Sequence, residues 1–151
     1  METIKLLPIT RQGRRPSVPA YQTAGAAAVD LHAFLEAPVT LLPGQRAVIP
    51  TGLCMEIPPG YGGFILARSG LSTRHGVTMA NGVGLIDSDY RGEVHVSLAN
   101  RGDAPYTIVD GERIAQFALL RTPAFVFEEV DDLSETARGA GGFGSTGASK
   151  V

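Results

Sequence analysis

The sequence has 151 residues, a formal net charge of −2 and a hydrophobic fraction of 44%. This length suits one domain, and the lack of a basic excess argues against a nucleic-acid-binding protein. No stretch approaches the roughly 18 apolar residues that a membrane-spanning helix requires, and the first ten residues have no signal-peptide core. The lone cysteine, Cys54, excludes an intrachain disulfide and favours a reducing, cytoplasmic location.

Short β-type runs separated by turn signals recur along the chain. The turn segments contain Pro, Gly, Asn and Asp, as in LPGQ, PPGYG and NRGDAP. One or two helical turns are expected in SGLSTRHG, closed by Gly76 as a C-terminal cap. Evenly spaced short strands predict an all-β sandwich or barrel. The expected strands lie within residues 28–34, 46–57, 62–67, 76–80, 93–99, 106–109, 113–120 and 125–130.

The segment ARSGLSTRHG is a candidate anion site, because the predicted helix starts just after Arg68. Free amides at a helix start attract anions, and Arg68 with Ser69 adds a charge and a hydroxyl. The alternative is that Ser69 only caps the helix.

The segment GLIDSDYRGEV places two carboxylates and an aromatic ring directly after an apolar run. Residues 81–98 are expected to form a β-hairpin whose turn lies at 87–92, with Val94, Val96 and Leu98 on one face of its second strand. A turn accounts for one aspartate but does not need Tyr90. The sequence leaves two interpretations, a turn covered by the Tyr90 ring or a binding site.

Gln116 lies in the middle of an apolar strand, within VDGERIAQF. If its amide faces the core, it needs hydrogen-bond partners, whereas a solvent-facing amide needs none. The three histidines have no zinc-like spacing with Cys54, and no nucleophile motif is apparent.

The C-terminal residues 137–151 are glycine-rich and have no apolar face, so they are expected to be a flexible segment that follows a β domain over residues 1–136. Their GxGxxG pattern is no dinucleotide fingerprint, because no strand–turn–helix unit surrounds it. The segment is either a plain flexible tail or a lid that binds phosphate and a base. Just before it, FVFEEV is a strand-like arm that is expected to pair with a neighbouring subunit. The candidate ligand-binding residues of the tail are Arg138, Phe143, Ser145 and Thr146.

Five segments, taken in order, resemble the motifs of the homotrimeric dUTP nucleotidohydrolase (dUTPase) family. They are AGAAAVDLHA, ARSGLSTRHG, NGVGLIDSDYRGEV, GERIAQ and RGAGGFGSTG, and they span nearly the whole chain. The one departure is Ala28, where the family usually has glycine. Alanine disfavours positive φ, so the local turn is expected to differ slightly. The resemblance implies a jelly-roll-like β-barrel or sandwich that forms a homotrimer with shared active sites.

The resemblance also implies how the nucleoside is read. The hairpin opened by Asn81 takes in uracil, and main-chain groups around Leu85, Ile86 and the strand near His95 read the base edge. A site built for uracil leaves polar groups unpaired with cytosine, at about 1–3 kcal/mol per lost partner.

The implied reaction is attack of water on the α-phosphorus of dUTP, giving dUMP and pyrophosphate, which limits uracil incorporation into DNA and supplies dUMP for dTMP synthesis. Asp87 is expected to orient the water, and Tyr90 to lie under the deoxyribose and exclude a 2′-hydroxyl. Asp30 is expected to hold waters of a Mg²⁺ ion on the phosphates. Phe143 is expected to stack on uracil. The other implied substrate-binding residues are Arg68, Ser69, Gly70, Gln116, Arg138, Gly144, Ser145 and Thr146.

Two other functions are consistent with this fold. Deamination of dCTP requires an acid–base side chain beside C4 of the base, usually glutamate, and the hairpin offers none before Glu93. A non-catalytic nucleotide-binding relative is expected to have lost the water-holding carboxylate or the tail arginine, yet Asp87 and Arg138 are both present.

Overall fold

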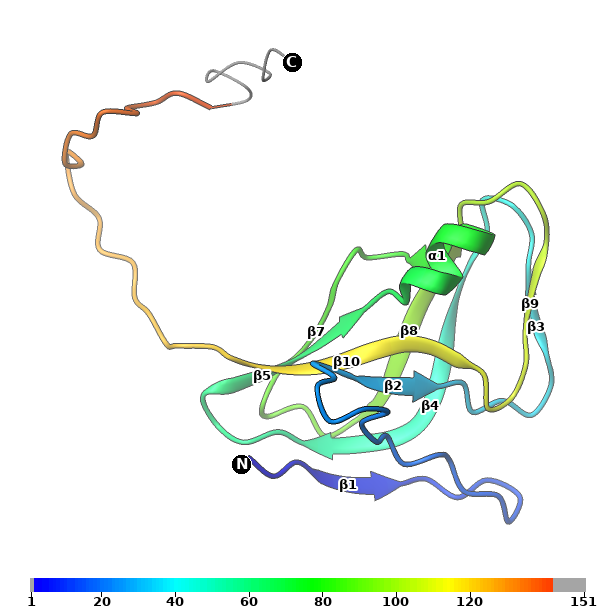
Figure 1. Ribbon diagram of the computed structural model, residues 1–151. Helices are drawn as coiled ribbons and strands as arrows, with labels where there is room; N and C mark the ends of the chain where they lie inside the picture. Colours follow the sequence, from blue (N-terminus) through cyan, green and yellow to red (C-terminus); the bar gives the residue numbers. More distant parts are fainter. Residues whose placement is uncertain (1, 143–151) are drawn as a thin grey trace.

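The computed structural model describes residues 2–142, and most of the regular structure in that range is β-strand (Figure 1). In that range one helix, α1 (Ser69–His75), lies between β5 (Tyr61–Leu66) and β6 (Val77–Met79). Within residues 2–142 no helix is long and apolar enough to cross a membrane. The strands are β1 (Lys5–Pro8), β2 (Val29–His32), β3 (Val39–Leu41), β4 (Arg46–Glu56), β5 (Tyr61–Leu66), β6 (Val77–Met79), β7 (Gly84–Ile86), β8 (Glu93–Asn100), β9 (Tyr106–Ile108) and β10 (Arg113–Arg121).

Two four-stranded antiparallel sheets form the body of the molecule. One has the strand order β1-β4-β8-β6 and the other β2-β10-β5-β7, while β3 and β9 form a separate short pair. Their apolar faces share one core, so the predicted all-β sandwich is confirmed. The largest fully buried side chains are Leu31, Ile49, Leu53, Ile57, Ile65, Leu98, Ile108, Ile114, Val77, Val94, Val96 and Asn100.

Strand β8 shows how the sequence pattern fixes the core. Val94, Val96 and Leu98 are fully buried, whereas His95 between them is exposed. This is the alternation that the sequence predicts, because successive side chains of a strand point to opposite faces.

Helix α1 ends where the sequence predicts. Gly76 adopts φ 68°, and its N–H donates to the carbonyl of Ser72 at 3.0 Å. A Cβ at this position would lie 2.3 Å from the amide nitrogen of Gly102. Glycine is therefore required both by the left-handed backbone and by the close approach of the 101–102 loop.

The predicted hairpin over residues 81–98 is wrong. β7 does not pair with β8; it pairs with β5 in the other sheet, with Phe64 opposite Leu85. β8 pairs instead with β6, with Met79 opposite Leu98. The chain between β6 and β8 thus crosses to the second sheet and returns. Alternation predicts which residues are buried, but it does not identify the partner strand.

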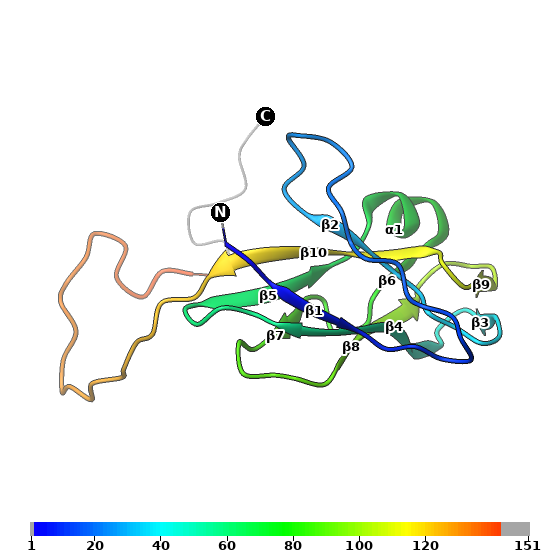
Figure 2. The same cartoon turned by 90° about the horizontal axis from the view of Figure 1, so that it is seen from below.

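Residues 125–130 form no strand within this single chain, and their expected pairing with a neighbouring subunit stays a prediction. β10 ends at Arg121, and the chain then leaves the body as an extended segment (Figures 1 and 2). Phe125 is 77% exposed and Phe127 is 94% exposed. A strand needs a hydrogen-bonded neighbour, and these residues have none within the described part of the chain.

Candidate active site

Asp30 is a buried carboxylate between two arginines. It lies on β2 opposite Gln116 of β10, and it is 6% exposed. Arg68 Nε donates to Asp30 Oδ1 at 3.0 Å, and Arg113 Nη1 donates to Oδ2 at 3.3 Å. Arg68 also donates to the main-chain oxygen of Arg113 at 3.1 Å. We call Asp30, Arg68 and Arg113 the Asp30 cluster.

The Asp30 cluster is positively charged, although the whole chain carries −2. One carboxylate faces two guanidinium groups, so one positive charge remains for a ligand. A buried carboxylate is tolerated only when it is paired, and here both of its oxygens are engaged. The carboxylate in turn fixes the arginines in orientation, which suits them to bind an anion without reorganisation.

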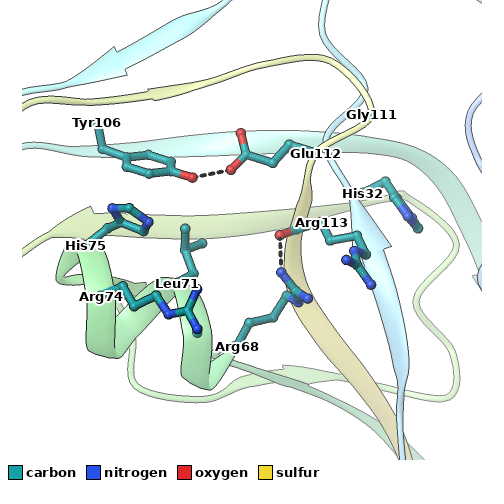
Figure 3. Close-up of a pocket in the computed structure, with 10 residues that line it drawn as sticks. His32, Arg68, Leu71, Arg74, His75, Tyr106, Gly111, Glu112 and Arg113 are labelled. Carbon is teal, nitrogen blue, oxygen red and sulfur yellow. Dashed lines mark hydrogen bonds between the residues drawn. The ribbon is translucent and has the colours of Figure 1, made fainter. Parts of the chain in front are cut away.

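Arg68 and Arg113 of the Asp30 cluster line a pocket of about 590 Å³ (Figure 3). Its walls bring together the start of α1, the end of β2 and the turn before β10. Arg74 of α1 lines the same space, which gives the pocket three arginines, and we call it the arginine pocket. The lining residues are His32, Arg68, Gly70, Leu71, Arg74, His75, Tyr106, Gly111, Glu112 and Arg113.

Two titratable groups in the pocket wall are held neutral at neutral pH. Burial, chiefly, lowers the pKa of His32, and Arg113 and Arg68 add to this while the Asp30 charge opposes it. Burial, followed by the hydrogen bond to the Glu112 carboxylate and the charge of that carboxylate, raises the pKa of Tyr106 to about 12. The positive charge of the pocket therefore comes from arginines, as an anion site that works across neutral pH requires.

The start of α1 tests the interpretation of Ser69 as a helix cap. Arg68 is the N-cap residue, with φ −83° and ψ 125°, and no side chain caps the helix. The alternative in which Ser69 only caps the helix is therefore wrong. Ser69 and Gly70 directly follow Arg68 in the sequence, and both are exposed. Gly70 lines the arginine pocket.

Gln116 is half-buried and sits between β2 and β5, opposite both Asp30 and Leu66. Ala28, the departure from the family pattern, needs no positive φ, because Gln12 is the one non-glycine residue with positive φ among residues 2–142. Alanine thus fits there without backbone strain.

A Mg²⁺ ion bound through water fits Asp30. Mg²⁺ keeps several waters and uses one or two carboxylates together with substrate phosphates. Because both Asp30 oxygens already accept from arginines, their remaining lone pairs suit hydrogen bonds from water better than a direct metal bond. Within residues 2–142 no group of three or more metal-ligating side chains occurs, so a protein-only metal cage is not formed there.

A second group of predicted site residues lies on β7 and the loop that follows it. We call Leu85, Ile86, Asp87 and Tyr90 the Asp87 ledge. Leu85 is 58% exposed and Tyr90 is 42% exposed. The turn bond runs from the Tyr90 N–H to the Asp87 main-chain oxygen at 3.2 Å, and within residues 2–142 the Asp87 carboxylate has no hydrogen bond. That carboxylate is therefore not needed to cap the turn.

The Tyr90 ring is fixed from one side. Its hydroxyl donates to the main-chain oxygen of Glu93 at 3.0 Å. A Cβ on Gly92 would lie 2.4 Å from the Tyr90 oxygen, so the ring covers this glycine closely. The ring packs over the turn, as one interpretation predicts, and it still leaves a large exposed area. Asn81 and His95 are also exposed.

The structure does not bring the two groups into one cavity. The Asp30 cluster borders the arginine pocket, whereas Asp87 lines another pocket of about 480 Å³. That second pocket is formed by β5, the Asp87 ledge and the residue after β10. Its lining residues are Tyr61, Gly62, Leu85, Asp87, Ser88, Asp89 and Thr122.

The described part of the tail shows Arg138 on an exposed turn. Its Nε donates to the Gly141 oxygen at 2.8 Å, and the Gly139 N–H donates to the Thr136 oxygen at 3.1 Å. The other predicted tail residues lie outside the described range; they are Phe143, Gly144, Ser145 and Thr146.

Two arginines of the pocket were not among the predicted site residues. Arg113 lies in the GERIAQ segment, where it resembles an ordinary exposed strand residue, and its partner Asp30 is 83 residues away in the sequence. Arg74 follows Gly70 by four residues, a spacing that puts both on one helix face. That spacing was a usable signal for Arg74.

Comparison with known proteins decides the family. The dUTPase family model matches residues 14–147. The chain belongs to the dUTPase family. A deoxyuridine 5'-triphosphate nucleotidohydrolase of Desulfitobacterium hafniense (strain DSM 10664 / DCB-2) is 50% identical over 153 residues, covering 99% of this chain and 100% of that protein.

Solved dUTPase structures share the fold. The dUTPase of Staphylococcus bacteriophage 80alpha with dUPNHPP is 25% identical, with a TM-score of 0.87, and covers 98% of this chain and 100% of that one. A mutant dUTPase from phage phi11 of S. aureus, described with a structural Mg(II) ion, has a TM-score of 0.76 at 22% identity and covers 87% of this chain and 98% of that one. The predictions of the family and of the fold are both confirmed.

Proposed function

We propose that this protein hydrolyses dUTP to dUMP and pyrophosphate, by attack of water on the α-phosphorus. Family membership supports the activity, and the observation that carries the mechanism is the Asp30 cluster beside the arginine pocket. A nucleoside triphosphate carries several negative charges and meets an anionic protein. A local excess of positive charge, to which these guanidinium groups contribute, overcomes that unfavourable field.

The triphosphate binds along the arginine pocket. Arg68, Ser69 and Gly70 contact phosphate oxygens, with Gln116 nearby. The Arg68 guanidinium is already oriented by Asp30, so it loses little side-chain entropy on binding. When bound, Mg²⁺ neutralises negative charge on the phosphates, and Asp30 accepts hydrogen bonds from its waters.

The nucleoside binds on the Asp87 ledge. Main-chain groups of Leu85, Ile86 and the strand near His95 read the edge of uracil, while Asn81 opens the segment that receives the base. The Tyr90 ring lies under the deoxyribose. An exposed, close-fitting aromatic face gives apolar contact to the sugar and leaves no room for a 2′-hydroxyl.

Asp87 orients the attacking water. An aspartate is a weak base at neutral pH, since its ordinary pKa is about 3.9. Its carboxylate makes no hydrogen bond within the described residues, so both oxygens are free to accept from the water. Arg138 stabilises the charge that develops on the α-phosphate, as the tail closes over the substrate.

The active site is shared between subunits of a homotrimer. The Asp30 cluster and the Asp87 ledge line different pockets of one chain, and a substrate must contact both. Exposed apolar side chains of the 125–130 arm, Phe125 and Phe127 among them, are further support for a neighbouring subunit.

The deaminase alternative loses support from the position of Glu93. Its carboxylate accepts the Gly52 N–H at 2.7 Å and pairs with Arg11, and its side chain is 11% exposed. A general acid–base group must reach the base, whereas this carboxylate is held by Gly52 and Arg11 within the protein.

Pyrophosphate release from dUTP, dCTP, dTTP and UTP tests the proposal. We expect rapid release from dUTP alone. Comparable rates on all four would refute base and sugar selection, and ammonia release from dCTP would favour the deaminase. Tight dUTP binding without pyrophosphate release would indicate a non-catalytic relative.

A further inference from the structure

A basic loop, residues 11–17, follows β1 and contains Arg11, Arg14 and Arg15. It is bound to the segment that carries Tyr90 and His95 through the Glu93 side chain. The Arg11 guanidinium donates to one oxygen of the Glu93 carboxylate. The other oxygen accepts the Gly52 N–H at 2.7 Å. The Glu93 side chain is 11% exposed, so its charge depends chiefly on these two partners; His95 Nε2 lies farther away, 3.8 Å from the carboxylate oxygen that Arg11 binds.

Gly52 marks an irregularity in β4 that makes this contact possible. The register between β4 and β8 shifts between Pro50 and Cys54, and Gly52 adopts φ +71° there. The Gly52 oxygen accepts the Ile9 N–H at 2.7 Å. The Gly52 oxygen therefore links the chain after β1 to β4. The Gly52 N–H links β4 to the Glu93 side chain at the start of β8.

The main chain of Glu93 in turn holds two nucleoside-facing side chains. Its oxygen accepts from the Tyr90 hydroxyl at 3.0 Å and lies 2.9 Å from His95 Nδ1. A carbonyl oxygen only accepts, so Nδ1 carries the proton in this contact. The position of the Tyr90 ring is thus set by the 93–94 peptide, and the Glu93 side chain anchors that peptide.

We propose that Arg11 and Glu93 form a positioning pair that sets the discrimination between deoxyribose and ribose. The inference rests on the proposed function, because it takes dUTP as the substrate. Neither side chain touches the nucleotide. Without Arg11, the Glu93 carboxylate lacks its counter-charge and turns toward water. The 93–94 peptide and the Tyr90 ring then move with it, and a 2′-hydroxyl is tolerated.

Arg14 provides a matched control on the same loop. Arg11 and Arg14 lie over the same Phe34 ring, at 5.4 and 5.2 Å from its centroid. Arg14, however, pairs with Asp110 at 3.3 Å and donates to the Leu35 oxygen at 2.8 Å, so it has no contact with Glu93. Its replacement weakens the loop without releasing the peptide below Tyr90.

The experiment compares kcat/KM for dUTP and for UTP in Arg11→Ala, Arg11→Lys, Glu93→Gln and Arg14→Ala. Glu93→Gln keeps the acceptor for Gly52 and sets an amide donor against Arg11. We expect the dUTP-to-UTP ratio to fall about tenfold in Arg11→Ala and Glu93→Gln, mainly through faster UTP turnover. Arg11→Lys should keep most of the ratio, and Arg14→Ala should keep all of it.

A melting temperature recorded for each variant separates positioning from stability. A lowered melting temperature with an unchanged ratio in Arg11→Ala would overturn the inference, as would an equal fall of the ratio in Arg14→Ala. Arg11→Ala and Arg11→Lys still test the pair if Glu93→Gln does not fold. Equal turnover of dUTP and UTP by the unaltered protein would overturn the proposed function instead.

Discussion

The Asp30 cluster and the Asp87 ledge differ in how far one chain completes them. In the cluster, both carboxylate oxygens are engaged and Asp30 is nearly inaccessible. On the ledge, Leu85 and Tyr90 are largely exposed, and the Asp87 carboxylate has no hydrogen bond within residues 2–142. The charged half of the proposed site is therefore preorganised, whereas the proposed nucleoside half is an exposed surface of the described chain.

This difference follows from what each half must do. Guanidinium groups that bind a polyanion must be oriented before it arrives, because each free side chain costs rotamer entropy on ordering. A base and a sugar are recognised by shape and by main-chain groups, which a strand edge holds rigidly without side-chain partners. We propose that the tail and a second subunit complete the ledge.

Removing the tail tests whether the tail completes the ledge. Of the changes considered, it should have the largest effect on dUTP turnover. Truncation after Ala137 removes Arg138 and the residues after it. We expect kcat/KM for dUTP to fall about 10³- to 10⁵-fold, the range for loss of an arginine that stabilises phosphoryl transfer. The melting temperature should not change, because residues 131–140 are exposed. Arg138→Ala in the full chain is the matched control, and unfolding of the truncated protein would contradict the lid.

Asp87→Asn removes the proposed water-orienting charge from the ledge. Turnover should fall about 10²- to 10⁴-fold, as for loss of a positioned general base, while dUTP binding is retained. Single-turnover kinetics and equilibrium binding of a non-hydrolysable analogue separate the two effects. A near-normal rate would remove Asp87 from the mechanism.

Co-expression of Asp87→Asn with Arg68→Ala tests whether the two regions meet across subunits. Each variant alone should be nearly inactive. If the regions of different subunits share a site, mixed trimers contain sites in which neither position is altered, and activity returns. Continued inactivity of purified mixed trimers would place both regions of a site in one chain.

The sequence predicts the core better than the connections between strands. The alternation in β8 identifies Val94, Val96 and Leu98 as core residues, because burial on a strand depends on local order alone. The pairing of β7 with β5 was missed, since Leu85 is adjacent to Phe64 only through the tertiary fold. The short edge strands β1 and β3 were missed for a related reason: each is three or four residues long and depends on a distant partner.

The site shows the same division. Motif order predicts Asp30, Arg68 and Asp87 as site residues, and the structure places the first two in contact. The second arginine on Asp30 was not predicted, because nothing near Arg113 in the sequence indicates a buried carboxylate. Equally, no local pattern indicates that the cluster and the ledge line separate pockets of one chain.

Asp30→Asn tests the preorganisation of the cluster through stability. The substitution leaves two guanidinium groups without a counter-charge, but Arg113 is 49% exposed and water screens it. We expect a loss of about 1–3 kcal/mol in the free energy of unfolding, measured by urea denaturation. Glu56→Gln is the matched control, because its pair with Lys5 is exposed, and it should cause no measurable change. If Asp30→Asn also caused no measurable change, the ion pairs of the cluster would not stabilise the folded protein.

The smallest effect should come from the wall of the arginine pocket, through Tyr106 and Glu112. Because the pKa of Tyr106 is raised from 10.0 to about 12, the unfolded chain loses this proton at lower pH than the folded protein does. The stabilisation is therefore fully present below pH 10 and is lost as the pH rises through 12. In urea denaturation, the stability difference between the unaltered protein and Tyr106→Phe should shrink between pH 9 and pH 11.5. Glu112→Gln should show a shallower decline, because the phenol then loses a charged acceptor but keeps its buried position. A difference that stays constant with pH would mean that the phenol titrates alike in the folded and unfolded chains, and that this wall of the pocket is as open to water as the ledge.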